Sequence, residues 1–443
     1  MSKIVIIGNG ISGVTAARHI RKNSDNEIVI ISAESEHFFS RTALMYVFMG
    51  HMRFQDIKPY EDYFWEKNRI DLVFDYVNHI DTDSKILEMK GGSKITYDKL
   101  VLAVGSKPNK FGWPGQDLPG VQGLYTYQDL ETIEENAKTA KHAVIVGGGL
   151  IGIELAEMMH SRGIETTFLV RESKFWRSVL PEEDGDLITR HIIDHKVDLR
   201  LNTELTEIIA GDDGRVKAVK TSEGDIVECQ IVGLTAGVSP NVEFVKASKI
   251  EVDRGIKVNE FCETNIQDVY AIGDCAQFNE SINGRRTIEQ VWYTGRIMGE
   301  TVAQTICGNK MPYNPGPWFN SAKFFDIEYQ TYGLVLANRE ENENSFFWEH
   351  PKGKISVHVV WDKASGEFIG INTFGIRMRH DIFDKWLKEK VSVDVVMSEL
   401  RSANFDPEFY RTYEKEIVDQ FNSKTGRNVE LKAKQWWRNL LAK

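Results

Sequence analysis

Cysteine is scarce in this sequence, and its placement excludes several kinds of site. The 443 residues include only Cys229, Cys262, Cys275 and Cys307, so the first 228 residues contain none. No two of the four have CxxC spacing and none lies in a histidine-rich segment, so we expect no metal site. Four scattered cysteines in a chain of this length do not form a disulfide framework either. We therefore expect a reducing compartment, the cytoplasm.

Long hydrophobic runs and an excess of positive charge are absent as well. The apolar runs have the length of a single β-strand, so no segment is expected to span a bilayer. Residues 1–3 lead straight into such a run, so we expect no signal peptide. The chain has 54 lysines and arginines against 65 aspartates and glutamates, and its net charge of -11 argues against nucleic-acid binding.

Glycine, in contrast, is placed in two regular clusters. The residues GNGISG at 8–13 follow an apolar run at 4–7, and GGGLIG at 147–152 follow an apolar run at 143–146. Each cluster predicts a buried strand that enters a tight turn and then a helix, whose N-terminal N–H groups hold the phosphates of a dinucleotide. The residues expected at the phosphates are Gly8, Gly10, Ile11, Ser12 and Gly13 in the first cluster and Gly147, Gly149, Leu150, Ile151 and Gly152 in the second.

Two dinucleotide sites in one chain indicate a flavoprotein that exchanges hydride with a nicotinamide coenzyme. One glycine cluster would be weak evidence, because glycine turns after strands are common. Two clusters, each in a strand–turn–helix setting, are hard to obtain by accident. The fold class expected is α/β, with one Rossmann-like domain for FAD and one for NAD(P).

The acidic residue after the second strand of the first unit indicates which dinucleotide binds there. Glu34 follows Gly13 by 21 positions, at the end of the apolar run 27–31. A carboxylate at this point accepts hydrogen bonds from the ribose hydroxyls, so the 2′-hydroxyl must be free. FAD and NAD meet this condition and NADP does not. A solvated acid at a strand end is the alternative interpretation.

The corresponding position of the second unit is basic. Arg171 follows Gly152 by 19 positions, and Arg177 lies six residues further on. Two guanidinium groups there can bind a 2′-phosphate, which favours NADPH. The carboxylate of Glu172 would repel this phosphate or serve the ribose of NADH, so both coenzymes stay open.

Three further segments carry a resemblance to a known family. Residues 99–108 read KLVLAVGSKP, residues 235–241 read TAGVSPN and residues 269–274 read VYAIGD. Together with the glycine clusters, they make residues 1–310 resemble the FAD-dependent pyridine nucleotide-disulfide oxidoreductases. The resemblance implies FAD and NADPH or NADH as cofactors, Asp274 at the ribityl chain of FAD, and Val77, Gly105 and Gly237 among the cofactor-binding residues.

The resemblance also implies the surroundings of the flavin ring. A helix from about residue 291 points its N-terminus at the ring, where the helix dipole stabilises negative charge on the reduced flavin. Glu289 and Gln290 lie at the entry of this helix. Glu154 matches a glutamate that faces the flavin and pairs with a lysine in relatives, but the matching segment here has no lysine. Glu154 and Tyr46 are the candidate catalytic side chains.

One departure from the disulfide-reducing branches narrows the chemistry. Those branches have a redox cysteine soon after the ribose glutamate, and Thr42 stands at that position here. Threonine forms no thiolate, so disulfide reduction and sulfenate-based oxidase chemistry are disfavoured. Residues 39–44, FSRTAL, instead resemble a stretch of the ferredoxin-, rubredoxin- and nitrite-reductase branch, in which the arginine, here Arg41, contacts the cofactor. This implies an oxidoreductase that passes electrons from the flavin to a small electron-carrier protein.

The region after residue 312 is expected to form contacts with other parts of the protein or with other molecules. Residues 318–321, WFNS, resemble the opening of the family's third domain, which covers the flavin edge or forms a homodimer interface. Near the end of the chain, apolar residues recur at helical spacing and predict an amphipathic helix. This helix packs on protein, lies on a membrane surface or docks a partner. The apolar positions are Val429, Ala433, Trp436, Trp437, Leu440 and Leu441.

Glycine- and proline-rich linkers and the resemblance together predict the domain boundaries. The alternatives to an electron-carrier reductase are a membrane-surface NADH:quinone reductase and a redox sensor similar to apoptosis-inducing factor. The expected domains are residues 1–111 with 238–312 for FAD, 112–237 for NAD(P), and 313–443 for an α+β part of the dimerisation type with the tail helix.

Overall fold

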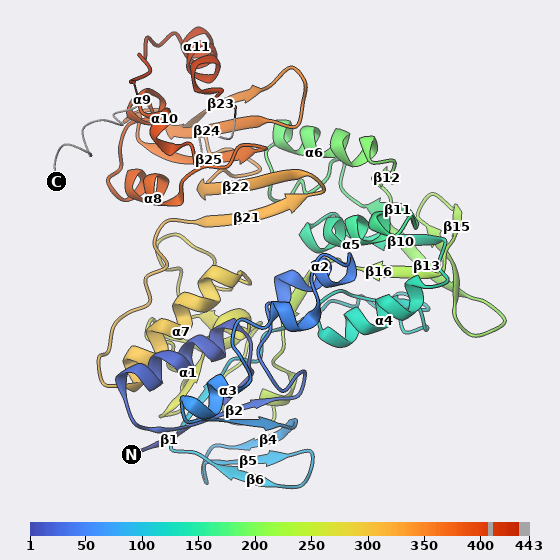
Figure 1. Cartoon of the computed structure of the whole chain (residues 1–443), viewed down its shortest axis with the longest axis vertical. Helices are drawn as coiled ribbons and strands as arrows, with labels where there is room; N and C mark the ends of the chain where they lie inside the picture. Colours follow the sequence, from blue (N-terminus) through green and yellow to red (C-terminus); the bar gives the residue numbers. More distant parts are fainter. Residues whose placement is uncertain (406–410, 434–443) are drawn as a thin grey trace. The chain divides into compact units, whose positions relative to one another are not determined.

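The computed structural model describes residues 1–405 and 411–433, and Figure 1 shows its elements with labels. Contacts within the chain group these residues into two compact units. The three predicted domains are not decided by this grouping and stay a prediction. Unit 1 comprises residues 1–145, 158–165 and 205–315, and unit 2 comprises residues 146–157, 166–204 and the described residues from 316 onward.

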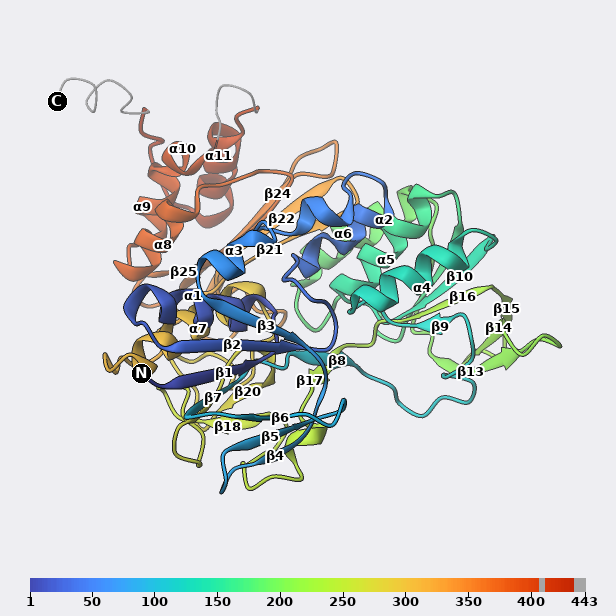
Figure 2. The same cartoon turned by 60° about the horizontal axis from the view of Figure 1, so that its bottom comes forward.

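A five-stranded parallel sheet lies in the core of unit 1. In spatial order its strands are β19 (Val269–Ala271), β7 (Lys99–Leu102), β1 (Lys3–Ile7), β2 (Glu27–Ser32) and β3 (Ile70–Phe74). Residues 4–7 of β1 pair in parallel with residues 28–31 of β2 and 99–102 of β7, and Figure 2 shows β1 and β2 side by side. Successive residues of β1 are buried, so both faces of the sheet are covered. This is why these strands read as continuous apolar runs.

Two helices of unit 1 pack closely against each other (Figure 1). α1 (Ile11–Asn23) begins within the first glycine cluster, directly after Gly10, and α7 (Trp292–Ile306) begins where a helix was predicted. A Cβ atom on Gly299 of α7 would lie 2.5 Å from the Ser12 carbonyl oxygen of α1, so this close approach requires glycine. The first strand–turn–helix unit and the helix near residue 291 are therefore confirmed.

Shorter elements complete unit 1. β8 (Ser106–Pro108) pairs antiparallel with β17 (Val238–Pro240), which brings together two of the segments that carry the family resemblance. The other strands are β4 (Val77–Asp81), β5 (Ile86–Met89), β6 (Lys94–Thr96), β13 (Leu205–Ala210), β14 (Val216–Thr221), β15 (Ile226–Glu228), β18 (Ile256–Val258) and β20 (Ala276–Phe278). The helices are η1 (Arg41–Ala43), α2 (Leu44–Phe48), η2 (Phe54–Ile57), α3 (Tyr63–Lys67), α4 (Tyr127–Ala137), η3 (Glu243–Val245) and η4 (Gly273–Cys275).

A second five-stranded sheet contains the strand that leads into the second glycine cluster. Its order is β12 (Asp198–Leu201), β11 (Glu165–Val170), β10 (His142–Val146), β16 (Ile231–Leu234) and β9 (Val121–Gln122). The chain passes from β10 through the glycine cluster into α5 (Leu150–Ser161), and α6 (Glu182–Asp194) follows β11. The second strand–turn–helix unit is thus confirmed, and with it the α/β class with two Rossmann-like sheets.

The C-terminal part of unit 2 is an antiparallel sheet with helices packed on it. In spatial order its strands are β21 (Phe319–Phe324), β22 (Ile327–Gly333), β25 (Phe368–Phe374), β24 (Ser356–Asp362) and β23 (Glu343–Glu349). The helices are α8 (His380–Lys388), α9 (Val393–Ser398), α10 (Leu400–Ala403) and α11 (Glu414–Thr425). Trp348, Phe383 and Phe421 are fully buried in the core that sheet and helices share. This agrees with the α+β character predicted for the region.

The start of the predicted tail helix is not helical. α11 ends at Thr425, and residues 427–433 have no regular secondary structure. The side chain of Asn422 holds Val429 by two hydrogen bonds, one to its N–H at 2.8 Å and one to its carbonyl oxygen at 2.9 Å. These bonds take up the backbone groups that a helix would use. The prediction is therefore wrong for Val429 and Ala433, whereas Trp436, Trp437, Leu440 and Leu441 lie outside the described residues.

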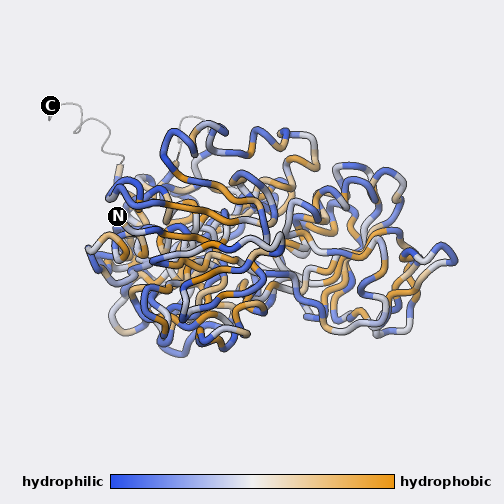
Figure 3. The backbone as a smooth tube through the Cα atoms, turned by 90° about the horizontal axis from the view of Figure 1, so that it is seen from below, coloured by the Kyte–Doolittle hydropathy of each residue, from blue (hydrophilic) through white to orange (hydrophobic). Residues whose placement is uncertain are grey.

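Figure 3 shows hydrophobic residues mainly along inner stretches of the backbone and hydrophilic residues in many of the outer loops. The longest helix in the described ranges, α7, has 15 residues. No helix in those ranges has the length and the apolar composition needed to cross a membrane.

Candidate functional site

The first glycine cluster combines tight packing with open space above a helix end. A Cβ atom on Gly8, where φ is 109°, would lie 2.1 Å from the Ala103 carbonyl oxygen. A Cβ atom on Gly13 would lie 2.1 Å from the Gly8 carbonyl oxygen. A Cβ atom on Gly10 would meet nothing within 4 Å. Gly10 is the N-cap of α1, which has no side-chain cap and no acid in its first turn, so this end fits the pyrophosphate of FAD.

Ser12 is the point where three parts of the predicted FAD site meet. A Cβ atom on Gly273 of η4 would lie 2.3 Å from the Ser12 hydroxyl oxygen, and one on Gly295 of α7 would lie 2.6 Å from it. The glycines therefore let η4 and α7 close on the first turn of α1. This packing brings Asp274, the next residue of η4, to the same end of the sheet as the glycine turn.

Glu34 and Arg41, both predicted from the sequence, are paired with each other. Arg41 donates from Nη1 to Glu34 Oε1 at 2.8 Å and from Nη2 to Oε2 at 2.6 Å, and the Tyr127 N–H donates to Oε1 at 3.0 Å. Burial opposes the charge of Arg41, but the Glu34 carboxylate outweighs it and raises the pKa of Arg41. A carboxylate has about four acceptor positions. Three of these positions on Glu34 are occupied, so one remains for a ribose hydroxyl. A second ribose hydroxyl could bind only if it replaced a hydrogen bond from Arg41.

Tyr125 is a residue of this site that the sequence analysis missed. The Arg41 guanidinium lies 4.6 Å from the centre of the Tyr125 ring and donates to the Tyr125 carbonyl oxygen. The Tyr125 hydroxyl donates to Asp274 Oδ2 at 3.3 Å and accepts from the Ser106 N–H at 2.9 Å. A continuous chain of contacts thus links Glu34 to Asp274. The sequence signal nearby is the capping box of Thr126 and Asp129, which marks the start of α4 but not the direction of the Tyr125 side chain.

Burial sets the protonation of the polar groups in this chain of contacts. Burial raises the pKa of Tyr125, so its hydroxyl stays protonated and acts as a donor. Burial also raises the pKa of Asp274, although the hydrogen bond from Tyr125 opposes the change. Both groups are therefore suited to hydrogen bonding with hydroxyl groups of a polyol, which donate and accept in turn.

The two residues at the entry of α7 have different partners. Glu289 is buried and accepts from Arg285 Nε and Nη2, both at 2.5 Å. Gln290 donates to the Ser106 hydroxyl at 2.7 Å, so its amide lies at the start of β8, next to the N–H that binds Tyr125. Of the two, Gln290 is the one linked, through Ser106, to the Tyr125–Asp274 contacts.

The remaining predicted FAD-site residues are spread over unit 1. Gly105 has a φ of 64°, and a Cβ atom there would lie 3.1 Å from the Tyr125 hydroxyl oxygen. Gly237 has a φ of 88° and faces the Asn109 amide. Val77 is the first residue of β4 and is buried in the core of unit 1. Gly105 thus belongs to the group around Tyr125, while the roles proposed for Gly237 and Val77 rest on the family resemblance.

No thiol is poised for redox chemistry in the described part of this site. Thr42 lies in η1, with its hydroxyl oxygen 3.4 Å from that of Ser40. Cys275, beside Asp274, is fully buried, and its sulfur donates to the Leu102 carbonyl oxygen at 3.5 Å. Burial raises the pKa of Cys275 to about 12. Its thiol is therefore neutral and is not a nucleophile at physiological pH.

The second glycine cluster repeats the construction of the first. Gly147 has a φ of 116°, a Cβ atom on Gly148 would lie 2.7 Å from Val170 Cγ1, and one on Gly149 would meet nothing within 4 Å. Leu150, Ile151 and Gly152 then form the first turn of α5. The open space at Gly149 and the helix end beside it fit the pyrophosphate of NAD(P)H.

The two arginines predicted for the 2′-phosphate have different environments. Arg171 follows β11, its side chain is 73% exposed, and its Nε lies 2.9 Å from Glu172 Oε1. Arg177 donates to the Ala337 carbonyl oxygen at 3.0 Å and to Asn338 Oδ1 at 2.9 Å. The guanidinium of Arg177 is thus engaged by the segment after β22, and that of Arg171 by its neighbouring acid.

The two candidate catalytic side chains lie in different units. Burial, and then the charge of Glu157, raise the pKa of Glu154 on α5 to about 7. Glu157, one helical turn further on, accepts from Lys323 Nζ at 2.6 Å. A lysine therefore does approach this helix, although it comes from β21 and pairs with Glu157. Tyr46 lies on α2, with its ring 6.2 Å from that of His51.

Comparison with known proteins agrees with this arrangement. Residues 2–301 match the family described as pyridine nucleotide-disulphide oxidoreductase. The chain is 32% identical to an NADH oxidase of Methanocaldococcus jannaschii, over 75% of this chain and 76% of that protein. It is 30% identical to the NADH-rubredoxin oxidoreductase of Clostridium acetobutylicum, over 71% of this chain and 76% of that protein. The crystal structure of a ferredoxin reductase from Rhodopseudomonas palustris has the same fold, with a TM-score of 0.79 at 22% identity over 95% of this chain and all of that one.

Proposed function

Because the chain belongs to the pyridine nucleotide-disulphide oxidoreductases, we propose that it passes electrons from NAD(P)H through FAD to a small iron–sulfur carrier protein. It is an oxidoreductase whose cofactors are FAD and NAD(P)H. The bound flavin accepts a hydride from the nicotinamide and releases the electrons to an acceptor. The proposed acceptor is the small iron–sulfur carrier protein.

The observation that carries the proposal is the lack of a reactive thiol in the FAD site. Thr42 occupies the position of the redox cysteine, the first 228 residues contain no cysteine, and Cys275 is buried and neutral. No protein thiol can therefore take electrons from the flavin and pass them to a disulfide. The acceptor must receive its electrons directly from the flavin. A relative named for rubredoxin supports a carrier protein as that acceptor.

The residues of unit 1 are proposed to hold FAD in a defined order. The glycine turn and the N-terminus of α1 bind the pyrophosphate, Glu34 and Arg41 bind the adenosine end, and Asp274 binds the ribityl chain. Tyr125 and Gln290 are added to this set, because their hydrogen bonds to Asp274 and Ser106 join the two ends. In unit 2, the turn from Gly147 to Gly152 and Arg171 are proposed to bind the coenzyme. Arg177, which the sequence also suggested, is proposed to have a structural role, because its guanidinium donates to Ala337 and Asn338.

Reductive titration of the purified, FAD-containing protein tests this proposal. Under anaerobic conditions, we expect the absorbance change to be complete after two electrons per FAD, because no thiol pair takes up further electrons. Steady-state assays with NADH and NADPH should then show rapid reduction of rubredoxin or ferredoxin and negligible turnover of glutathione disulfide or CoA disulfide. Four electrons per FAD, or rapid disulfide turnover, would contradict the proposal. A Cys275→Ser variant should behave as the wild type does.

A second candidate acceptor is dioxygen, because one relative is named an NADH oxidase. Oxygen consumption with NADH distinguishes this case, since carrier-free turnover as rapid as the turnover with rubredoxin would favour an oxidase. Quinone analogues in the same assay test the third alternative, since rapid reduction of a quinone analogue would favour an NADH:quinone reductase. A long-lived charge-transfer absorbance with slow turnover would favour the redox sensor.

We also propose a cytoplasmic location and a homodimer formed through residues 313–443. The scarcity of cysteine supports the location, because exported proteins more often contain disulfides. The resemblance of residues 318–321 to the opening of the family's third domain supports the dimer. Size-exclusion chromatography with light scattering of the holoprotein tests the dimer, and a monomer at micromolar concentration would contradict it.

A further inference from the structure

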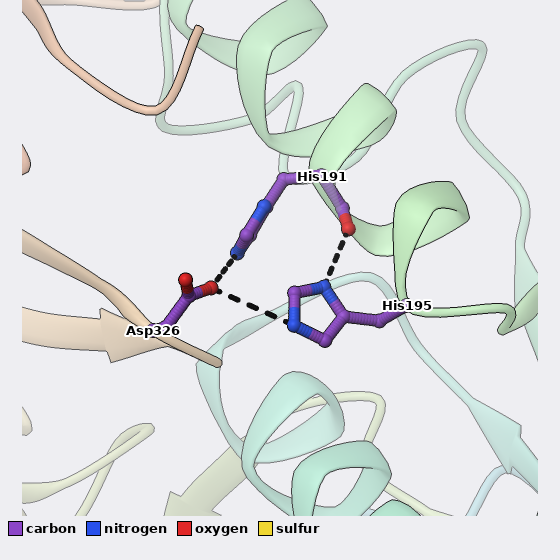
Figure 4. A group of neighbouring side chains, drawn as sticks. All are labelled: His191, His195 and Asp326. Atoms are coloured by element: carbon purple, nitrogen blue, oxygen red, sulfur yellow. Dashed lines mark hydrogen bonds and ion pairs between the residues drawn. The ribbon is translucent and has the colours of Figure 1, made fainter.

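Three side chains with metal-binding atoms meet in unit 2, apart from the glycine turn (Figure 4). His191 lies in the last turn of α6 and His195 directly follows that helix, so their spacing of four places both on one face of it. Asp326 lies in the turn between β21 and β22. The three ligand atoms all lie within 4.8 Å of one another. We propose that His191, His195 and Asp326 form a binding site for one divalent transition-metal ion of the zinc class.

The distances in this cluster suit a shared ion. Asp326 Oδ1 lies 2.8 Å from His191 Nε2 and 3.5 Å from His195 Nε2. In a tetrahedral zinc site with bonds of about 2.0–2.1 Å, neighbouring ligand atoms lie about 3.3 Å apart. The two measured separations lie on either side of this value, and all three ligand atoms lie within 4.8 Å of one another. A zinc ion would therefore draw the three side chains into a tetrahedral arrangement by small movements of the rings and the carboxylate.

A hydrogen bond selects the tautomer of His195, and stacking orients its ring. Its Nδ1 lies 2.9 Å from the His191 carbonyl oxygen, and a carbonyl can only accept, so Nδ1 carries the proton. In the neutral ring, Nε2 then presents its lone pair towards Asp326. The ring also stacks on Phe325 at 4.2 Å with an interplanar angle of 18°. A hydrogen bond to the second ring nitrogen is the usual way in which proteins orient a metal-binding histidine.

His191 is a buried imidazole whose nitrogens lack well-aligned partners. Its side chain is 2% exposed, and among the described residues neither ring nitrogen makes a hydrogen bond of good geometry. A bound ion would give the buried Nε2 of His191 the well-aligned partner that the described residues do not supply.

The carboxylate is oriented from its other side. Lys354 Nζ lies 2.8 Å from Asp326 Oδ2, which leaves Oδ1 directed at both imidazoles. The side chains of Lys354 and Asp326 are 51% and 56% exposed, so solvent screens the ammonium charge from an ion at Oδ1. The same exposure leaves room for water as a fourth ligand.

The ligand set selects the class of metal. Two imidazoles and one carboxylate suit Zn²⁺ and its neighbours Co²⁺, Ni²⁺ and Cu²⁺. Mg²⁺ and Ca²⁺ prefer oxygen ligands in larger number. Such an ion would join the end of α6 to the turn between β21 and β22. This proposed site differs from the prediction, made from cysteine spacing, that the chain has no metal site. That prediction did not consider ligands far apart in the sequence, and Asp326 lies more than 100 residues from the two histidines.

Zinc binding by the full-length, FAD-containing protein without a histidine tag tests the proposal. After chelator treatment and dialysis, we expect wild type to bind one Zn²⁺ per chain at micromolar free zinc, measured by elemental analysis after equilibrium dialysis. Asp326→Asn and His195→Ala should each raise the Kd by about 100-fold or more, because loss of even an outer-shell partner costs about 10–100-fold. Saturating zinc should raise the Tm of wild type and leave that of Asp326→Asn unchanged.

His19→Ala is the matched control, because His19 on α1 is 24% exposed against 22% for His195 and lies outside the cluster. This variant should bind zinc as wild type does. The proposal fails if wild type takes up no zinc under these conditions. It also fails if Asp326→Asn, a change at an exposed position that should fold normally, leaves the stoichiometry and the Kd unaltered.

Discussion

The choice between NADPH and NADH is expected to depend on Arg171 and not on Arg177. Both arginines follow β11 in the sequence, but their side chains bind different groups of the protein. The side chain of Arg171 is 73% exposed and has Glu172 beside it, so it can turn towards a phosphate. The guanidinium of Arg177 is held by Ala337 and Asn338. Replacement of each arginine by alanine should therefore have a different effect on coenzyme use.

The size of the effect follows from the exposure of Arg171. A hydrogen bond to a charged group contributes about 1.5–3 kcal/mol, and a solvent-exposed guanidinium lies at the lower end. Each factor of ten in affinity corresponds to about 1.4 kcal/mol. Arg171→Ala should thus raise the KM for NADPH about tenfold and leave the KM for NADH near the wild-type value. Glu172→Gln removes a surface competitor that contributes about 0.2–1 kcal/mol, so the KM for NADPH should fall about 1.5- to 5-fold.

Steady-state kinetics with ferricyanide as a saturating acceptor provide the measurement. The ratio of kcat/KM for NADPH to that for NADH is compared among wild type, Arg171→Ala, Glu172→Gln and Arg177→Ala. For Arg177→Ala, we expect no change in this ratio and a lower Tm, because its lost contacts are to the protein. Equal effects of Arg171→Ala on the two coenzymes would refute the reasoning. So would a selective loss of NADPH use in Arg177→Ala.

Two further predictions concern the first glycine cluster and a buried ion pair. Gly8→Ala should prevent normal folding, because its Cβ would lie 2.1 Å from the Ala103 carbonyl oxygen, whereas Gly10→Ala should keep the Tm of the FAD-free protein and weaken FAD retention. The Tm and the flavin absorbance per chain measure this, and identical behaviour of the two variants would contradict it. Burial lowers the pKa of His358, but Asp184, 3.4 Å away, outweighs burial and raises it. The charged pair therefore stabilises the folded protein fully when the pH is below the pKa of an unfolded histidine, about 6.5. This stabilisation is lost as the pH rises through the pKa of His358 in the folded protein. The urea midpoint should therefore fall over this range in wild type, and a parallel fall in His358→Phe would count against this pair.

The sequence was sufficient to predict the features that depend on neighbouring residues. Two apolar runs, each followed by a glycine cluster, predicted two strand–turn–helix units, and β1 with α1 and β10 with α5 confirm both. The reason is that a parallel strand, a turn with positive φ and a helix end each impose requirements on a few consecutive residues. The same local reasoning failed at Val429, where the side chain of Asn422 binds the backbone that was expected to be helical.

Tertiary structure alone decided which side chains meet. Tyr125 joins Arg41 to Asp274, although these residues are separated by most of unit 1 in the sequence. His195 meets Asp326 because the end of α6 packs beside the turn after β21. Such contacts depend on how elements that are distant in the sequence pack against one another. Neither the periodicity nor the spacing of residues in the sequence predicts this packing. The local sequence therefore determined the two strand–turn–helix units, while the packing of distant elements determined which side chains surround them.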